Sequence, residues 1–174
     1  LKDNLKILLA EDDPLNGELF MELLASQYKN ATVKWVVNGA EAIKALKKDW
    51  YDIVVMDIEM PVMNGYKASE EIRNAADMSY ANIPILGMTA HIVEDVMEKC
   101  YKSGMNDCIS KPFQIEYLTK KINSLSKRKI EVDHNNEFNK NDKYVQIFKS
   151  SFNDDLKALV KSKKEGDMNK ILSI

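Results

Sequence analysis

The residues best suited to chemistry in this chain stand at the ends of short apolar runs. Glu11 and Asp12 close the first run, Asp57 closes the third, Thr89 follows the fourth, and Lys111 follows the fifth. Carboxylates that crowd together repel one another and must bind either a proton or a cation. Because a small cluster of oxygen ligands with room for water suits Mg²⁺ rather than zinc, we expect a magnesium site here.

A metal ion, an ammonium group and a hydroxyl group around one carboxylate are the groups that phosphoryl transfer requires. The metal and the ammonium group of Lys111 neutralise charge on the transferring group, and the carboxylate attacks in line. The product of that reaction is an aspartyl phosphate. This chemistry is available only where the side chains meet, so the elements that carry them must bring the ends of the apolar runs together.

Short apolar runs alternate with amphipathic stretches five times along the chain. The apolar runs predict β-strands, and the apolar residues spaced three or four apart after each run predict helices. Five strand–helix units in series predict a doubly wound α/β domain with a five-stranded parallel sheet. In such a sheet, ligands bind beyond the carboxyl ends of the strands. The predicted strands are residues 5–10, 32–36, 52–57, 83–88 and 107–110.

Two helix boundaries can also be predicted from single residues. Pro14 suits the first turn of the first helix, and Asp13 before it is expected to cap that helix, although a strand-end aspartate could also belong to the acidic site. The third helix is expected to extend to about Ala76, after the turn that holds Asn64 and Gly65.

The composition excludes several classes of protein. Apolar residues make up 45% and charged residues 30% of the chain, as in a soluble globular protein. The net charge of −2, with scattered Lys and Arg, predicts no general affinity for nucleic acid. No apolar stretch is long enough for a membrane span, and the chain begins at Leu1 without a signal-peptide pattern. We expect a cytoplasmic fragment of a longer protein, with Cys100 and Cys108 as buried free thiols.

Five motifs, taken in order, resemble the receiver domains of two-component signalling. Each motif alone is weak evidence for the family, but all of them in order at strand ends are highly specific. Their sequences are most similar to those of receivers attached to hybrid histidine kinases. The resemblance covers about residues 5–127 and implies a flavodoxin-like strand order of 2-1-3-4-5. The motifs are Glu11-Asp12, Asp57-x-x-Met60-Pro61, Asn64-Gly65, Met88-Thr89-Ala90 and Lys111-Pro112-Phe113.

The resemblance implies a role for each acidic residue of the site. Asp57 is the phosphoacceptor, and its donor is a histidine kinase or a histidine phosphotransfer domain. Asp12 and Asp57 ligate Mg²⁺ directly, the backbone carbonyl of Glu59 supplies a third protein ligand, and Glu11 acts through a metal-bound water.

The resemblance also implies how the modified protein switches. Thr89 donates a hydrogen bond to the phosphoryl group, Lys111 pairs with its charge, and the Lys111–Pro112 bond is expected to be cis. Receivers commonly carry Tyr or Phe three residues before the Lys, whereas here that position is Cys108. A small apolar side chain cannot swing inward and change the surface as an aromatic ring does. We therefore expect activation to move mainly the loop after the fourth strand and the helix that follows.

Partners and rival functions can be weighed from the same residues. By family analogy, Leu15 and Leu19 of the first helix are the expected docking surface for a helical phosphodonor. One alternative is a metal-dependent phosphatase with an aspartyl intermediate, but that class usually has Asp-x-Asp, and here Glu59 follows Asp57 by two residues. Another is an inert interaction module, which would usually lack the acceptor, a metal carboxylate or the lysine. A signalling relay, rather than a turnover enzyme, is the leading interpretation.

The chain divides into three predicted parts. Residues 1–127 form the receiver domain, residues 128–141 form a polar linker, and residues 142–174 form a helical segment. That segment resembles the opening of a histidine-containing phosphotransfer domain, cut off before its histidine. The alternative is a general amphipathic helix used for packing or for pairing with a second copy of the chain. No helix-turn-helix pattern follows residue 127, so we expect no DNA contact.

Overall fold

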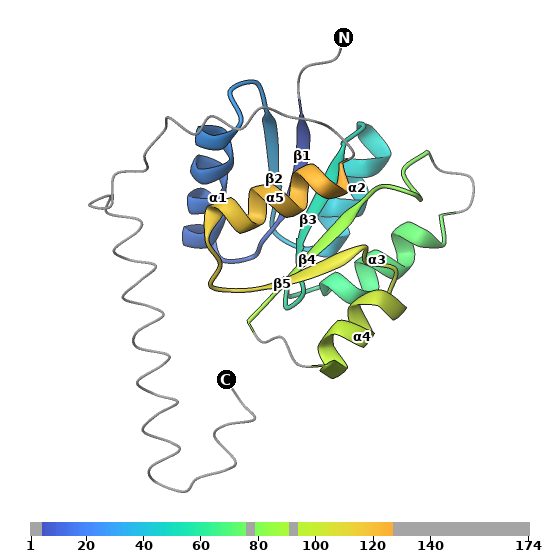
Figure 1. The fold of residues 1–174 in the computed structure, drawn as a ribbon. Helices are drawn as coiled ribbons and strands as arrows, with labels where there is room; N and C mark the ends of the chain where they lie inside the picture. The colour runs from blue at the N-terminus through green and yellow to red at the C-terminus, as the bar shows by residue number, and fades with distance from the viewer. Residues whose placement is uncertain (1–4, 76–78, 91–93, 127–174) are drawn as a thin grey trace, which may run out of the picture. The chain divides into compact units, whose positions relative to one another are not determined.

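A computed structural model describes residues 5–75, 79–90 and 94–126 of the chain (Figure 1). The predicted linker and C-terminal helical segment lie outside the described residues. Five parallel strands form one sheet in the order β2-β1-β3-β4-β5, which confirms the predicted topology. The strands are β1 (Lys6–Ala10), β2 (Thr32–Val36), β3 (Ile53–Asp57), β4 (Ile85–Thr89) and β5 (Asp107–Ser110).

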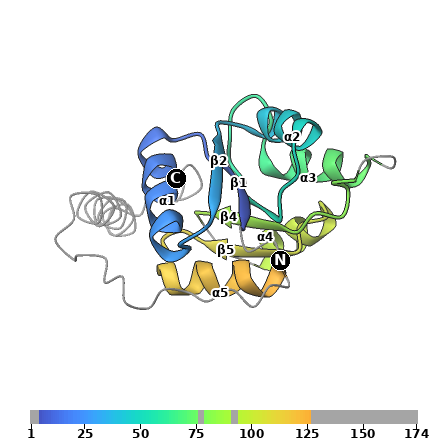
Figure 2. The ribbon, with the colours of Figure 1, turned by 90° about the horizontal axis from the view of Figure 1, so that it is seen from above.

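Helices cover both faces of the sheet. In Figure 2, α1 and α5 lie on one face, and α2, α3 and α4 lie on the other. Within the described residues, no helix is long and apolar enough to cross a membrane. The helices are α1 (Pro14–Gln27), α2 (Gly39–Lys48), α3 (Gly65–Arg73), α4 (Glu94–Lys102) and α5 (Ile115–Leu125).

Two hydrophobic cores result from the alternation of side chains along each strand. In β3, Val54 and Met56 pack in the core beneath α2, α3 and α4, whereas Ile53 and Val55 pack in the core beneath α1 and α5. All five residues of β3 are buried, as expected for a parallel strand that helices cover on both faces. The strand that ends in Asp57 is therefore held rigidly from both sides.

Several predicted boundaries differ from the observed ones. β1 and β3 each begin one residue later than predicted, and the fourth strand and third helix differ more. The fourth strand was expected over residues 83–88, but β4 runs from Ile85 and includes Thr89, because Thr89 pairs in register with Ser110 of β5. The third helix was expected to reach about Ala76, but α3 ends at Arg73, and the backbone N–H of Asn74 caps it by donating to the carbonyl of Glu70.

Side-chain caps fix the starts of α1 and α3, the helices that follow β1 and β3. Asp13 accepts a hydrogen bond from the backbone N–H of Asn16 at 2.9 Å, so its expected capping role at α1 is confirmed. Asn64 caps α3 in the same way, by accepting from the N–H of Lys67 at 2.9 Å. These caps set where the chain turns from each strand end into the next helix, and thereby shape the loops around the acidic residues.

Candidate functional site

The predicted site residues meet at the carboxyl edge of the sheet. Glu11 follows β1, Asp57 ends β3, Thr89 ends β4, and Lys111 follows β5. Glu11, Asp57 and Thr89 are buried. Residues that are about a hundred positions apart in sequence are thus brought together by the parallel strand order, as the sequence predicted.

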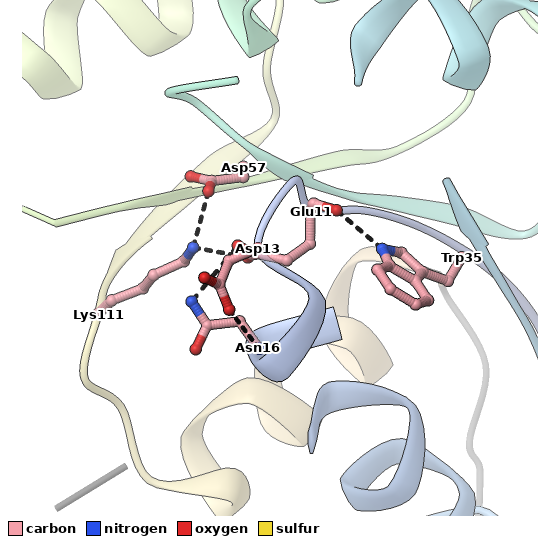
Figure 3. A network of polar contacts seen from close by, with 6 residues as sticks. All are labelled: Glu11, Asp13, Asn16, Trp35, Asp57 and Lys111. Atoms are coloured by element: carbon pink, nitrogen blue, oxygen red, sulfur yellow. Dashed lines mark hydrogen bonds and ion pairs between the residues drawn. The ribbon is translucent and has the colours of Figure 1, made fainter. Parts of the chain in front are cut away.

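Lys111 holds two of the carboxylates at once (Figure 3). Its Nζ atom lies 2.6 Å from Oε2 of Glu11 and 2.8 Å from Oδ2 of Asp57. The Lys111 side chain is 16% exposed, and those of Glu11 and Asp57 are 1% and 9% exposed. One ammonium group therefore balances two carboxylates in a place that water barely reaches.

Two aromatic rings support the lysine. The ring of Phe113 stacks on that of Phe20 from α1, with centroids 5.4 Å apart, and Nζ of Lys111 lies 5.8 Å from the Phe20 centroid. A cation over an aromatic face is favourable in itself. The Lys111–Pro112 peptide bond is cis, as the resemblance implied.

The burial of these charges shifts their pKa values in ways that bear on cation binding. Burial is the main cause that raises the pKa of Glu11 to about 7; Lys111 lowers this pKa, and the charge of Asp57 adds to the rise. Burial lowers the pKa of Lys111, but the neighbouring charges of Asp57 and Glu11 outweigh that effect, so its pKa is raised overall. Lys111 therefore stays charged, and the carboxyl group of Glu11 is easier to protonate than an exposed glutamate.

An acidic cluster at this edge has the donor set of a hard divalent cation. One carboxylate oxygen from each of Glu11, Asp12 and Asp57 lies within 4.8 Å of the others. The donors are all oxygens, which suits Mg²⁺. The side chain of Glu59 is exposed, and the expected role of its backbone carbonyl stays a prediction. The residues present thus fit the predicted magnesium site.

The loop after β3 brings helix α3 very close to the acceptor. The backbone N–H of Gly65 donates to the carbonyl of Ile58 at 2.9 Å, and a Cβ atom on Gly65 would lie 2.3 Å from the backbone oxygen of Asp57. Val62 in the same loop has a φ of 67°, which β-branched residues rarely adopt. The N–H of Met63 donates to the carbonyl of Pro61 at 2.7 Å and closes a three-residue turn there.

The two residues of the expected docking surface are placed differently. Leu15 is 54% exposed in the first turn of α1, beside the acidic cluster. Leu19 is only 5% exposed, so the expectation that it forms part of an exposed docking surface is wrong. Four residues further along α1, the side chain on the same face of the helix is therefore already covered.

Cys100 and Cys108 are buried free thiols, as predicted. Cys108 lies in β5, three residues before Lys111, and packs against the core beneath α4. Burial raises the pKa of the Cys108 thiol, and a hydrogen bond with the side chain of Cys100 raises it further. At the position where receivers commonly carry an aromatic residue, this chain thus has Cys108, whose side chain is small, protonated and buried.

Sequence reasoning missed two residues beside the site. The indole Nε1 of Trp35 donates to the backbone carbonyl of Glu11 at 2.8 Å, and the side chain of Asn16 lies 3.5 Å from Oε1 of Glu11 (Figure 3). Trp35 lies on β2, and an aromatic residue in a strand rich in β-branched residues indicates only that its side chain packs against its neighbours. Asn16 lies one helical turn beyond the acidic run, where a polar residue is ordinary.

Comparison with known proteins identifies the family that shares this arrangement. Residues 7–123 match the family model described as the response regulator receiver domain. The sensor histidine kinase RcsC of Escherichia coli (strain K12) is 31% identical over 129 residues, which is 72% of this chain and 13% of that protein. The hybrid signal transduction histidine kinase G of Dictyostelium discoideum is 35% identical over 119 residues, or 68% of this chain and 3% of that protein. The chain spans only a small part of these two relatives.

Two solved structures share the fold. The receiver domain of the sensor histidine kinase PA1611 from Pseudomonas aeruginosa PAO1, with a magnesium ion coordinated in its active site cleft, is 31% identical with a TM-score of 0.64. The match covers 72% of this chain and 99% of that one. A co-crystal structure from Saccharomyces cerevisiae, of the histidine phosphotransfer protein Ypd1 with the receiver domain of Ssk1, matches at 26% identity and a TM-score of 0.64. That match covers 75% of this chain and 94% of the other.

Proposed function

We propose that this chain, which belongs to the family of response regulator receiver domains, accepts a phosphoryl group on Asp57 from a phosphohistidine donor. The observation that carries the proposal is the placement of Asp57, which ends the central strand β3 within an acidic cluster and lies 2.8 Å from the ammonium group of Lys111. Asp57 thus has a candidate cation site and a positive charge beside it at the carboxyl end of the sheet.

Each side chain has a definite part in the transfer. A carboxylate oxygen of Asp57 forms a bond to phosphorus as the bond from phosphorus to the donor's imidazole nitrogen breaks. Lys111 releases one carboxylate contact and pairs with the phosphoryl oxygens instead. Mg²⁺, when bound, neutralises charge on those oxygens. Asp12, Asp57 and the backbone carbonyl of Glu59 would hold the ion, and Glu11 would act through a bound water.

The alternative of a turnover phosphatase has less support. Such an enzyme needs a second carboxylate that acts as acid or base beside the nucleophile. The residue two positions beyond Asp57 is Glu59, and its side chain is exposed. The family is one of signalling domains, so we propose that the chain promotes only its own phosphorylation and dephosphorylation. Because the relatives include sensor histidine kinases, we place it in a longer protein of that class.

Labelling with a small acyl phosphate tests the function directly. We expect the intact mass to rise by one phosphoryl group in the presence of Mg²⁺, and to stay unchanged in EDTA or in the Asp57→Asn variant. Asp107→Asn is the matched control, because Asp107 also pairs with a lysine, Lys121, at 2.5 Å but lies on β5. Labelling that persists in Asp57→Asn would overturn the assignment, as would a folded wild-type protein that never labels beside a receiver that does.

Phosphorylation is expected to be read out through Thr89 and α4. Thr89 is 5% exposed at the end of β4, where its hydroxyl would donate to the new phosphoryl group, and α4 is the next helix in the chain. Cys108 is enclosed and lacks the reach of an aromatic ring, so the switch depends on Thr89. We expect amide NMR shifts on phosphorylation to extend into α4. Shifts confined to residues 57–65 would contradict this role of Thr89.

The surface around the site supports docking of a helical partner. Leu15, Val37 and Val62 follow β1, β2 and β3, and they are 54%, 47% and 87% exposed. These three residues form an apolar rim on the carboxyl edge of the sheet, beside the acidic cluster. A helical bundle that presents a phosphohistidine fits this arrangement. The Ypd1–Ssk1 co-crystal joins two other proteins, a histidine phosphotransfer protein and a receiver domain.

Leu15→Ala is expected to slow phosphoryl transfer from a phosphohistidine protein about fivefold, since truncation of an exposed anchor costs on the order of 1 kcal/mol in binding. Labelling by the small acyl phosphate should be unchanged, because that donor needs no protein surface. Trp50→Ala is the control, as Trp50 is 46% exposed but lies before β3, at the opposite edge of the sheet. Equal losses with both donors would show instead that Leu15 supports the site itself.

A further inference from the structure

The backbone of the acidic turn is held on both sides by one strand. The N–H of Glu11 donates to the carbonyl of Val36 at 3.1 Å, and the carbonyl of Glu11 accepts from Nε1 of Trp35 at 2.8 Å. Both partners lie at the end of β2. The Glu11 carbonyl belongs to the same peptide unit as the N–H of Asp12, so the indole hydrogen bond fixes the plane of the peptide that joins the two acidic residues.

The indole is itself held in place by a glycine of α1. A Cβ atom on Gly17 would lie 2.3 Å from Cε2 and 2.4 Å from Cζ2 of Trp35, and 2.8 Å from Nε1. The flat ring therefore lies directly against the helix backbone, with no room to rotate toward α1. Gly17 and Trp35 form a matched pair: the missing side chain of one accommodates the ring of the other, and Nε1 is directed at the Glu11 carbonyl (Figure 3).

The carboxylates need such support because they repel one another. Glu11, Asp12 and Asp57 lie close together, and of these three carboxylates Lys111 pairs with those of Glu11 and Asp57. Within the part of the chain that the structure describes, Asp12 forms no ion pair, so its backbone is what keeps it at the cluster. We propose that Trp35 is a positioning residue, whose indole N–H holds the Glu11–Asp12 peptide in the conformation that binds a divalent cation.

This inference rests on the proposed function, because it needs the acidic cluster to be the Mg²⁺ site. Trp35→Phe keeps an aromatic ring over Gly17 but removes the N–H. We expect it to weaken Mg²⁺ binding about tenfold, the effect usual for a hydrogen-bond partner behind a metal ligand. Gly17→Ala, which displaces the indole without changing it, should weaken binding in the same direction. Trp50→Phe is the matched control, and its affinity should equal that of the wild type.

Mg²⁺ affinity is measured by calorimetry at a temperature where every variant is folded, so that lost stability alone cannot produce the effect. The indole N–H of Trp35 gives a second readout, because its NMR signal can be identified by its loss in Trp35→Phe. This signal should shift during a Mg²⁺ titration, and the dissociation constant from that shift should equal the one from calorimetry. The indole N–H signal of Trp50 should not shift. If Trp35→Phe bound Mg²⁺ with wild-type affinity, or if the Trp35 signal did not change on addition of Mg²⁺, this inference would be overturned and the proposed metal site would stand. A wild-type chain that binds no Mg²⁺ would overturn the metal site and this inference with it.

Discussion

Replacing Lys111 with methionine is expected to slow phosphorylation of Asp57 about a hundredfold, the usual effect of removing one preorganised positive or hydrogen-bonding group from a transition state. The reason lies in the double contact of the ammonium group, 2.6 Å from Glu11 and 2.8 Å from Asp57. A methionine side chain fills a similar volume but offers no charge to the phosphoryl oxygens. The rate is measured as the growth of the phosphoryl adduct with time at saturating Mg²⁺.

The same substitution is expected to change stability in a way that depends on the metal. Without Lys111, two buried carboxylates lose their shared partner, and breaking such a pair costs about 3 kcal/mol of unfolding free energy. We therefore expect a large loss of stability in EDTA. Mg²⁺ should restore more stability to the variant than it adds to the wild type, because the ion replaces the missing positive charge.

Lys121→Met is the matched control for Lys111→Met. Lys121 also pairs with an aspartate, Asp107, at 2.5 Å, but it is 26% exposed on α5. A pair of that kind contributes about 1 kcal/mol or less, and its loss should affect neither labelling nor the response to Mg²⁺. Lys111→Met protein that labels at the wild-type rate would show that the ammonium group holds the unmodified site together and takes no part in transfer.

The sequence predicted the site well because its residues are tied to strand ends. A buried parallel strand is apolar along its whole length, so its last residue can be located to within one position. Asp57 ends β3, and Thr89, expected just beyond the fourth strand, is its last residue. Once the strand order is known, the carboxyl ends must share one edge. The meeting of Glu11, Asp57 and Lys111 therefore follows from periodicity and topology, without knowledge of any individual contact.

What the sequence could not predict depends on contacts between elements. Leu15 and Leu19 lie one helical turn apart on the same side of α1, but Leu15 is exposed and Leu19 is buried. The packing of Trp35 against Gly17 joins β2 to α1, and neither residue is unusual within its own element. Local patterns reveal which face of an element is apolar, but not how far a neighbouring element covers it.

Gly65→Ala is expected to destabilise the protein by about 3 kcal/mol, at the upper end of the cost of overpacking. The new Cβ atom would lie 2.3 Å from the backbone oxygen of Asp57 and 3.0 Å from Cα of Ile58. Both neighbours are backbone atoms of a strand end that is buried on two faces, so neither can yield as a flexible side chain would. Urea denaturation with an unchanged slope measures the loss.

Asn64→Ala is the control that distinguishes steric crowding by the new methyl group of Gly65→Ala from a weakened N-terminus of α3. Asn64 is exposed and caps α3 through the N–H of Lys67, and its loss should cost about 1 kcal/mol without moving the strand end. We expect Gly65→Ala, but not Asn64→Ala, to slow labelling of the folded protein, because only the extra methyl group pushes on the peptide that carries Asp57. Equal stability losses in the two variants, with wild-type labelling rates in both, would mean that α3 can move away from β3 freely. The tight approach of helix to acceptor would then be a packing feature, and the position of Asp57 would be set by the sheet alone.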